Sequence, residues 1–285
     1  MREIHILGKE TQVQAIRASD ADRREWLAAA PRCPELNEYR IVHCGLMRAK
    51  MPFEVVRLNL SGTFFFACFE GKGQVLIDSQ WRTVRAGEAC VQPPFIPNAL
   101  KASQDASWKF CWVRYQEAPR SKPLVSLHSP ALGKYDATML RLAIKGLHAE
   151  TLSVNSNATA MNWIDLIHKY VLTFAHPVGM DERLMTVWSE VEHHLDKDWT
   201  LQNLADIGCV SREHLRRLCT SALGRSPMEH LTFLRMQRAA SLLRTTNYKI
   251  AIVARKVGYA NPFSFSDAFQ RRFGWRPSVY REQKS

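Results

Sequence analysis

The chain of 285 residues has no long apolar run. A membrane-spanning helix needs roughly 18 or more consecutive apolar residues, and the densest apolar stretch here is only Phe64 to Phe69. The first residues, Met1 to His5, also lack the apolar core of a secretory signal peptide. We therefore expect a cytoplasmic protein with no membrane span.

Paired cysteines and clustered histidines are missing as well. The seven cysteines are scattered and odd in number, and none forms a C-x-x-C pair. This argues against a disulfide framework and a structural zinc site, and favours small buried side chains. No histidine lies between His43 and His128, so that region lacks the donor atoms of a metal enzyme. We expect no catalytic residues, no metal and no cofactor.

Acidic residues are scarce at the end of the chain. Residues 200–285 hold 15 Lys and Arg against 5 Asp and Glu, a net charge of +10, whereas residues 1–199 hold 24 against 22, a net charge of +2. Nearly all of the excess positive charge therefore lies in the last third of the chain. Such an excess suits either a solubilising surface or a nucleic-acid footprint.

One pattern occurs twice between Leu201 and Tyr280. A polar cap begins a helix that ends at a glycine, first from Ser211 to Gly224 and again, 50 residues later, from Asn261 to Gly274. A shorter helix and a three-residue turn precede each copy, which is the helix-turn-helix signature. The helix between the copies, residues 228–243, would span about 24 Å. Both second helices could then enter successive major grooves of double-stranded DNA.

The outward faces of these two helices supply the candidate DNA contacts. Arg can read guanine or bind phosphate, and exposed Arg is also common as a solvated charge. Arg272 lies beside the second helix and is a further cation there. The predicted DNA-binding residues are Arg212, Glu213, Arg216, Arg217 and Thr220 in the first unit, and Phe263, Ser264, Asp267, Gln270 and Arg271 in the second.

Residues 181–281 resemble the DNA-binding domain of the AraC/XylS family of bacterial transcription regulators. The resemblance rests on the positions Leu204-Ala205, Arg217, Ser226-Pro227, Gly258-Tyr259 and Phe273-Gly274, among others. It implies two helix-turn-helix units, transcriptional activation or repression, a homodimer, and RNA polymerase as a candidate partner. Two positions depart from the family. Cys219 replaces the usual Phe, which predicts a looser first unit, and Asp267 replaces Arg, which leaves the base preference of the second unit open.

Short strands dominate residues 39–116. Runs such as Glu54–Leu58, Phe64–Phe69 and Gln74–Asp78 are separated by turns at intervals of about ten residues, which predicts a sandwich or small barrel. Gly-x-Gly, a strand, Ala-Gly-Glu and a Pro-rich exit resemble the cupin-type jelly roll. Two helices should follow, near 138–147 and 158–174, and their apolar faces suit either core or self-association.

Aromatic and cationic side chains in this β region suggest either a filled core or a pocket for a small ligand. Phe110, Trp112 and Arg114 should alternate onto one face of their strand. Arg donors beside aromatic rings would suit a sugar or a small anion. The candidate ligand-binding residues are Arg57, Trp81, Phe95, Trp112 and Arg114.

The sequence thus predicts an α+β protein of two domains. Residues 1–176 would form a cupin-like β-barrel followed by helices, for effector sensing and dimerisation; 177–180 would be a linker; 181–285 would be an all-α tandem helix-turn-helix domain. The predicted function is a ligand-responsive transcription regulator of carbohydrate or other small-metabolite genes. The alternatives are a regulator without an effector, controlled by partner proteins, and a cupin-type enzyme fused to a DNA-binding domain.

Overall fold

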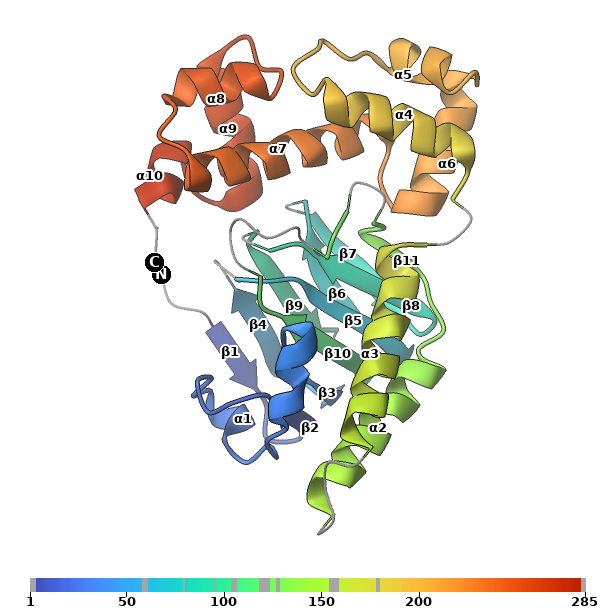
Figure 1. Cartoon of the computed structure of the whole chain (residues 1–285), viewed down its shortest axis with the longest axis vertical. Coiled ribbons are helices and arrows are strands. Elements are labelled where there is room, and N and C mark those ends of the chain that lie inside the picture. Colours follow the sequence, from blue (N-terminus) through green and yellow to red (C-terminus); the bar gives the residue numbers. More distant parts are fainter. Residues whose placement is uncertain are drawn as a thin grey trace.

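The computed structural model describes residues 4–57, 61–78, 80–94, 96–103, 107–117, 124–126, 129–153, 159–177 and 180–282. Within these ranges the N-terminal part is built from antiparallel strands and two long helices, and the C-terminal part is helical (Figure 1). The predicted α+β class is confirmed. No helix of the described residues is long and apolar enough to span a membrane.

The strands form two sheets. One has five strands in the order β1-β4-β9-β6-β7, and the other has six in the order β11-β8-β5-β10-β3-β2. Every pairing within the two sheets is antiparallel. The strands are β1 (Ile4–Leu7), β2 (Gln12–Arg17), β3 (Ile41–Ala49), β4 (Phe53–Arg57), β5 (Phe64–Glu70), β6 (Lys72–Ile77), β7 (Gln80–Arg85), β8 (Glu88–Gln92), β9 (Asn98–Ala102), β10 (Trp108–Tyr115) and β11 (Leu132–Lys134).

Alternation along β10 separates two cores, as the sequence predicts. Phe110 and Trp112 pack in one cluster with residues of both sheets. Cys111 and Val113 face the opposite side and belong to a second cluster that includes helical residues. Because successive side chains of a strand point to opposite faces, the six-stranded sheet is covered on both sides.

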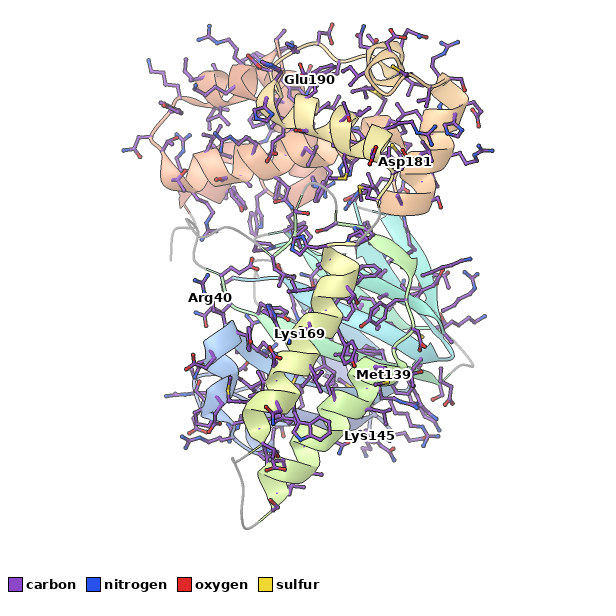
Figure 2. All side chains as sticks on the ribbon, turned by 45° about the vertical axis from the view of Figure 1, so that its right-hand side comes forward. Arg40, Met139, Lys145, Lys169, Asp181 and Glu190 are labelled. Carbon is purple, nitrogen blue, oxygen red and sulfur yellow. The ribbon has the colours of Figure 1, made fainter. Side chains whose placement is uncertain are left out.

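Two helices cover the outer side of the six-stranded sheet. They are α2 (Thr138–Leu152) and α3 (Ala160–Ala175), which run side by side (Figure 2). Phe174 of α3 packs edge-on against Phe65 of β5, with ring centroids 5.6 Å apart. The short helix α1 (Glu25–Ala28) and the 3-10 helix η1 (Pro34–Tyr39) lie between β2 and β3.

Seven helices form the C-terminal part. They are α4 (Glu182–His193), α5 (Leu201–Ile207), α6 (Arg212–Leu223), α7 (Pro227–Thr245), α8 (Ile250–Lys256), α9 (Pro262–Phe273) and α10 (Pro277–Glu282) among the described residues. In Figure 1, α7 lies above the sheets, with α4, α5 and α6 near one end and α8, α9 and α10 near the other. The helix bounds agree with those predicted from the caps.

Several strands were not predicted from the sequence. β1 and β2 fall in a stretch that gave no clear pattern, and β9 and β11 are short. β3 is buried along most of its length and therefore lacks the alternation of a half-exposed strand. All seven cysteines are free and six of them are buried, which confirms their predicted role as packing residues.

Candidate nucleic-acid interface

The first helix-turn-helix unit is fixed by polar caps. Thr200 and Asn203 form a reciprocal capping box at the start of α5, and the Ser211 hydroxyl accepts from the backbone N–H of His214 at the start of α6. Gly224 ends α6 in the left-handed conformation, with φ 67°. Each cap satisfies donors or acceptors that a helix end leaves open. Ser211 and Gly224 therefore fix where α6, the second or recognition helix of this unit, begins and ends.

The second unit repeats this design with a different core. The Asn261 side chain accepts from the backbone N–H of Phe263, Pro262 occupies the first turn of α9, and Gly274 ends it with φ 73°. Phe269 and Phe273 stack with centroids 4.2 Å apart, and Tyr280 of α10 packs edge-on against Phe269. Aromatic packing therefore holds α9 on α10.

Cys219 of the first unit corresponds to Phe269 of the second, and it is fully buried. Burial raises the pKa of its thiol to about 12, so it acts as a small apolar packing residue. Trp188 of α4, also fully buried, contacts the Cys219 thiol and packs edge-on against His230. A large ring from α4 thus lies beside the position where the first unit has a small side chain.

Every predicted DNA-contact side chain is exposed. On α6 and α9 the buried positions are Leu215, Cys219, Leu223, Phe265, Phe269 and Phe273. Phe263 is 79% exposed, an unusual position for a large aromatic residue. Local contacts orient two cations: Arg216 lies 3.5 Å from the Glu213 carboxylate, and Arg217 lies 2.8 Å from the His214 ring. The exposed predicted contacts are Arg212, Glu213, Arg216, Arg217, Thr220, Phe263, Ser264, Asp267, Gln270 and Arg271.

Arg272 is not available as a DNA contact, contrary to its grouping with the recognition-helix cations. Its guanidinium lies 2.5 Å from one oxygen of Asp78, while Arg225 lies 2.7 Å from the other oxygen. Arg225 and Arg272 both lie over the ring of Phe233, at 4.0 and 5.0 Å. One carboxylate after β6 therefore binds both units, through the α6–α7 loop and through the end of α9.

Burial and ion pairing have opposite effects on the pKa values of Asp78 and Arg272. Burial alone would raise the pKa of Asp78, but Arg225 and Arg272 more than offset it and hold that pKa well below its usual range. Burial also lowers the pKa of Arg272, against the opposing effect of Asp78. The bridge is therefore charged on both sides at neutral pH.

Two further contacts join the N-terminal part to the end of α6. Arg82 of β7 donates to the Gly224 carbonyl oxygen at 2.7 Å, and the Ala131 N–H donates to the Leu223 carbonyl oxygen at 3.0 Å. The N-terminal part thus contacts both recognition helices near their C-terminal ends. Residues in the N-terminal half of a recognition helix usually contact bases. In that half the predicted contacts are exposed, namely Arg212, Glu213, Arg216 and Arg217 in α6 and Phe263, Ser264 and Asp267 in α9.

The predicted ligand residues are only partly brought together. Arg57 and Trp112 line the same cavity between the sheets, but its volume is only about 10 Å³. Trp112 packs on Gly45, where an added Cβ would lie 2.5 Å from the indole, and Trp108 packs equally closely on Gly73. The interior between the sheets is therefore filled by side chains.

Two other ligand candidates, Arg114 and Trp81, lie elsewhere. Arg114 lies 3.6 Å from the Asp22 carboxylate, at the edge of a buried polar cluster. Trp81 is 39% exposed, with the Lys101 ammonium 4.2 Å from its ring, so it does not line the cavity that Arg57 and Trp112 share. Phe95 lies outside the described residues.

His43 is the centre of that polar cluster and is fully buried. The Trp112 indole N–H donates to its Nδ1 at 2.8 Å, and Arg24 lies 3.0 Å from its Nε2. Burial, and then the nearby Arg24 and Arg114, hold the pKa of His43 well below its ordinary value. The imidazole is therefore neutral at physiological pH.

Asp78 and Arg225 are functional candidates that the sequence did not reveal. Asp78 follows a strand and Arg225 follows a helix, where charged residues are ordinary. The single hint is the left-handed backbone of Asp78, with φ 51°, which is visible only in the structure. Their pairing spans 147 residues of sequence, so no local pattern could predict it.

Comparison with known proteins identifies the helical part. Residues 204–283 match the family described as a helix-turn-helix domain. The chain is 27% identical over 228 residues to the raffinose operon transcriptional regulatory protein of Pediococcus pentosaceus, covering 75% of this chain and 82% of that protein. It is 32% identical over 123 residues to the lactose operon transcription activator of Staphylococcus xylosus, covering 41% and 44%.

A protein of Streptomyces lividans described as an AraC-like transcription regulator is 38% identical over 86 residues, covering 30% of this chain and 28% of that protein. The matched region therefore spans less than half the length of two of these three relatives. All three are transcription regulators by name, and none is named as an enzyme. Residues 204–283 therefore form a helix-turn-helix domain of the kind found in AraC-type DNA-binding transcription regulators.

Proposed function

We propose that the chain regulates transcription in response to a small molecule, and that its targets are carbohydrate or other small-metabolite genes. The observation that carries this proposal is the contact between the N-terminal part and the C-terminal ends of both recognition helices. A change in that part could alter the relative placement of α6 and α9, and hence DNA affinity. The sugar-operon names of two relatives support the target class.

The proposed domains are residues 1–176 for sensing and dimerisation and 181–285 for DNA binding, joined by 177–180. Support comes from the chain's organisation, because the strands precede residue 135 and the helices from α4 onward contain the paired units. Residues 178 and 179 lie outside the described residues. RNA polymerase would be a further partner if the protein activates transcription.

In DNA recognition we assign different tasks to the two units. Arg212, Arg216 and Arg217 of α6 offer guanidinium groups that match guanine or phosphate. In α9, Phe263 offers an apolar ring for a thymine methyl group, and Asp267 can accept from cytosine N4. The two units should therefore prefer different base sequences.

A gel-shift assay with the full chain tests DNA recognition. Upstream DNA fragments from the neighbourhood of its own gene would be compared with scrambled fragments of equal length, over a range of salt concentrations. We expect selective binding that weakens with salt, since each phosphate contact contributes about −0.9 to the slope of log affinity against log salt. Equal affinity for scrambled DNA would contradict the proposal.

A regulator without an effector is the second candidate, because the space between the sheets is nearly filled. The two candidates differ in thermal stability, since a ligand that binds the folded state must raise the melting temperature. A panel of sugars, sugar phosphates and organic acids would be screened for saturable shifts. If no compound produces one, the effector-free regulator is the better description.

A further inference from the structure

A cavity lies between the sheets and the second helix-turn-helix unit. We call it the junction cavity; its volume is about 210 Å³, far larger than the cavity between the sheets. Strand β8 and the segment that follows it supply Gln92, Pro93, Ile96 and Pro97 to its wall, and β6 supplies Leu76 and Ile77. The opposite wall comes from Arg225, from Arg271 and Arg272 of α9, and from Gly274.

The charge of the junction cavity is positive. Three guanidinium groups line it, from Arg225, Arg271 and Arg272, against the single carboxylate of Asp78. Asp78 pairs with Arg225 through one carboxylate oxygen and with Arg272 through the other. The lining charges therefore sum to +2, which favours an anion in a cavity that is otherwise largely apolar.

Two buried polar atoms of the lining residues have no hydrogen-bond partner among the described residues. One is Nε of Arg272, a donor whose side chain is 9% exposed. The other is Oε1 of Gln92, an acceptor on a residue that is 5% exposed. Its amide nitrogen is already oriented by a 3.4 Å bond to the Leu76 carbonyl oxygen. Buried polar atoms normally have partners, so this pair indicates a molecule that supplies both an acceptor and a donor.

We infer that the junction cavity binds a small hydroxylated anion, such as a sugar acid or a sugar phosphate. The anionic group accepts from Arg272 Nε, beside the other two guanidiniums, and a hydroxyl donates to Gln92 Oε1. Leu76, Ile77, Val91 and Ile96 contact the carbon skeleton. The inference rests on the proposed function, because it supplies the effector site that the filled interior between the sheets does not.

Binding there would act on the recognition helices directly. The anion binds Nε of Arg272, the guanidinium whose terminal nitrogen pairs with Asp78 and so joins α9 to the N-terminal part. Arg271 also lines the cavity from the last turn of α9. An occupied cavity therefore changes the contact that fixes α9 relative to α6, and DNA affinity should change with it.

Thermal melting of the full chain tests this site with five probes at matched ionic strength: D-gluconate, D-glucose 6-phosphate, inorganic phosphate, hexanoate and D-glucose. We expect a saturable rise in melting temperature with gluconate or with glucose 6-phosphate, and the stronger of the two identifies the anionic group as carboxylate or phosphate. Hexanoate lacks hydroxyls and glucose lacks charge, so both should bind at least tenfold more weakly, about 1.4 kcal/mol.

Three variants locate the binding. Arg272→Lys keeps the charge but removes Nε, and Gln92→Met keeps the length but removes the acceptor; each should weaken the bound probe about tenfold, as expected for a lost charge-assisted or buried hydrogen bond. Arg85→Gln is the matched control, because Arg85 is an exposed cation of β7 outside the cavity. It should leave the shift unchanged.

If neither gluconate nor glucose 6-phosphate produces a saturable rise in melting temperature, the inference is overturned. Equal shifts with gluconate and hexanoate, or a shift unaffected by both cavity variants, would overturn it too. Gel shifts on the same preparations separate this failure from failure of the proposed function. Selective DNA binding without any anion effect refutes only the site, whereas a saturable anion effect without selective DNA binding refutes only the regulator.

Discussion

At the scale of single residues, the turns of the two units differ in the residue type that adopts a positive φ angle. Each turn needs a residue with positive φ; the second unit has Gly258 at φ 76°, and the first has Cys209 at φ 50°. A side chain in this conformation costs roughly 1–2 kcal/mol, whereas glycine adopts it without that cost. Gly258 is also constrained by space, since an added Cβ would lie 2.4 Å from Arg235.

We predict that Gly258→Ala lowers the free energy of unfolding by about 2 kcal/mol, from the left-handed backbone and from the clash with Arg235. That clash matters because Arg235 donates to the Leu195 and Lys197 carbonyl oxygens and so joins α7 to the end of α4. Cys209→Gly should have the opposite sign, with a gain of about 0.5 kcal/mol after the entropy of glycine is subtracted. Urea unfolding followed by tryptophan fluorescence measures both, and destabilisation by Cys209→Gly would contradict the argument.

His43 predicts a dependence of stability on pH. Its pKa is depressed in the folded protein, mainly by burial and then by Arg24, Arg114 and Arg57. The unfolded chain therefore binds a proton first, near pH 6.5. The contribution of His43 is complete above that pH and is lost as the pH falls, by up to about 1.4 kcal/mol per pH unit.

The melting temperature should consequently fall between pH 7 and pH 5, and His43→Asn should flatten that fall while keeping an acceptor for Trp112. His148 and His168 also have lowered pKa values through burial, so a smaller slope should remain. An unchanged slope in the variant would show that His43 is not the group responsible.

At the scale of elements, α6 and α9 carry similar backbones and dissimilar surfaces. We predict that Arg216→Ala weakens binding to the preferred DNA by ~1–3 kcal/mol if the side chain reads a base. Titration of labelled DNA measures the change, with Arg85→Ala as a control that removes the same charge elsewhere. A loss of equal size on all sequences would assign Arg216 to a phosphate instead.

The pair α2 and α3 offers the surface for the proposed homodimer. Met139 and Leu142 of α2 are 51% and 48% exposed, and Met161 and Leu166 of α3 are each 37% exposed. Figure 2 shows Met139 and Lys145 on α2 and Lys169 on α3, so charged residues accompany these apolar ones. Apolar side chains ringed by charged ones are typical of association surfaces.

Leu142→Glu should therefore convert a dimer to a monomer, because it would bury an unpaired carboxylate. Sedimentation velocity of the full chain measures the change, and Lys145→Glu is a milder control on the same helix. A wild-type chain that sediments as a monomer at micromolar concentration would contradict the dimer, and an unchanged dimer in Leu142→Glu would exclude this surface.

At the scale of the whole molecule, Asp78 couples the two parts. Its partners Arg225 and Arg272 are 3% and 9% exposed, and removing one partner of a buried pair costs about 3–5 kcal/mol. We predict that Asp78→Asn lowers the stability of the junction by roughly 3 kcal/mol and separates the melting of the two parts into two calorimetric transitions. A single unchanged transition would show that other contacts hold the parts together.

Acid should have the same effect as the Asp78 substitution. Because the folded pKa of Asp78 is depressed, its stabilisation is complete above the unfolded pKa of about 3.9 and declines as the pH falls below that value. The two transitions should therefore separate in the wild-type chain only in acid.

The amino-acid sequence alone determined the local structure of the helical part. Thr200, Ser211, Asn261, Gly224 and Gly274 set helix ends by hydrogen bonds and backbone conformations within a few residues, so the paired units, their exposed faces and the charge partition could all be predicted. The alternation along β10 was also local, which is why its two faces were assigned correctly.

Only the tertiary structure decided which of those elements contact one another. The pairing of Asp78 with Arg225 and Arg272, the filled space around Trp112 and the junction cavity all join residues that are far apart in the chain. Such contacts depend on how whole sheets and helices pack, and a charged residue after a strand has the same local pattern whether or not a partner approaches it. The sequence therefore indicated a DNA-binding regulator, and the packing of its two parts indicated where a signal could enter.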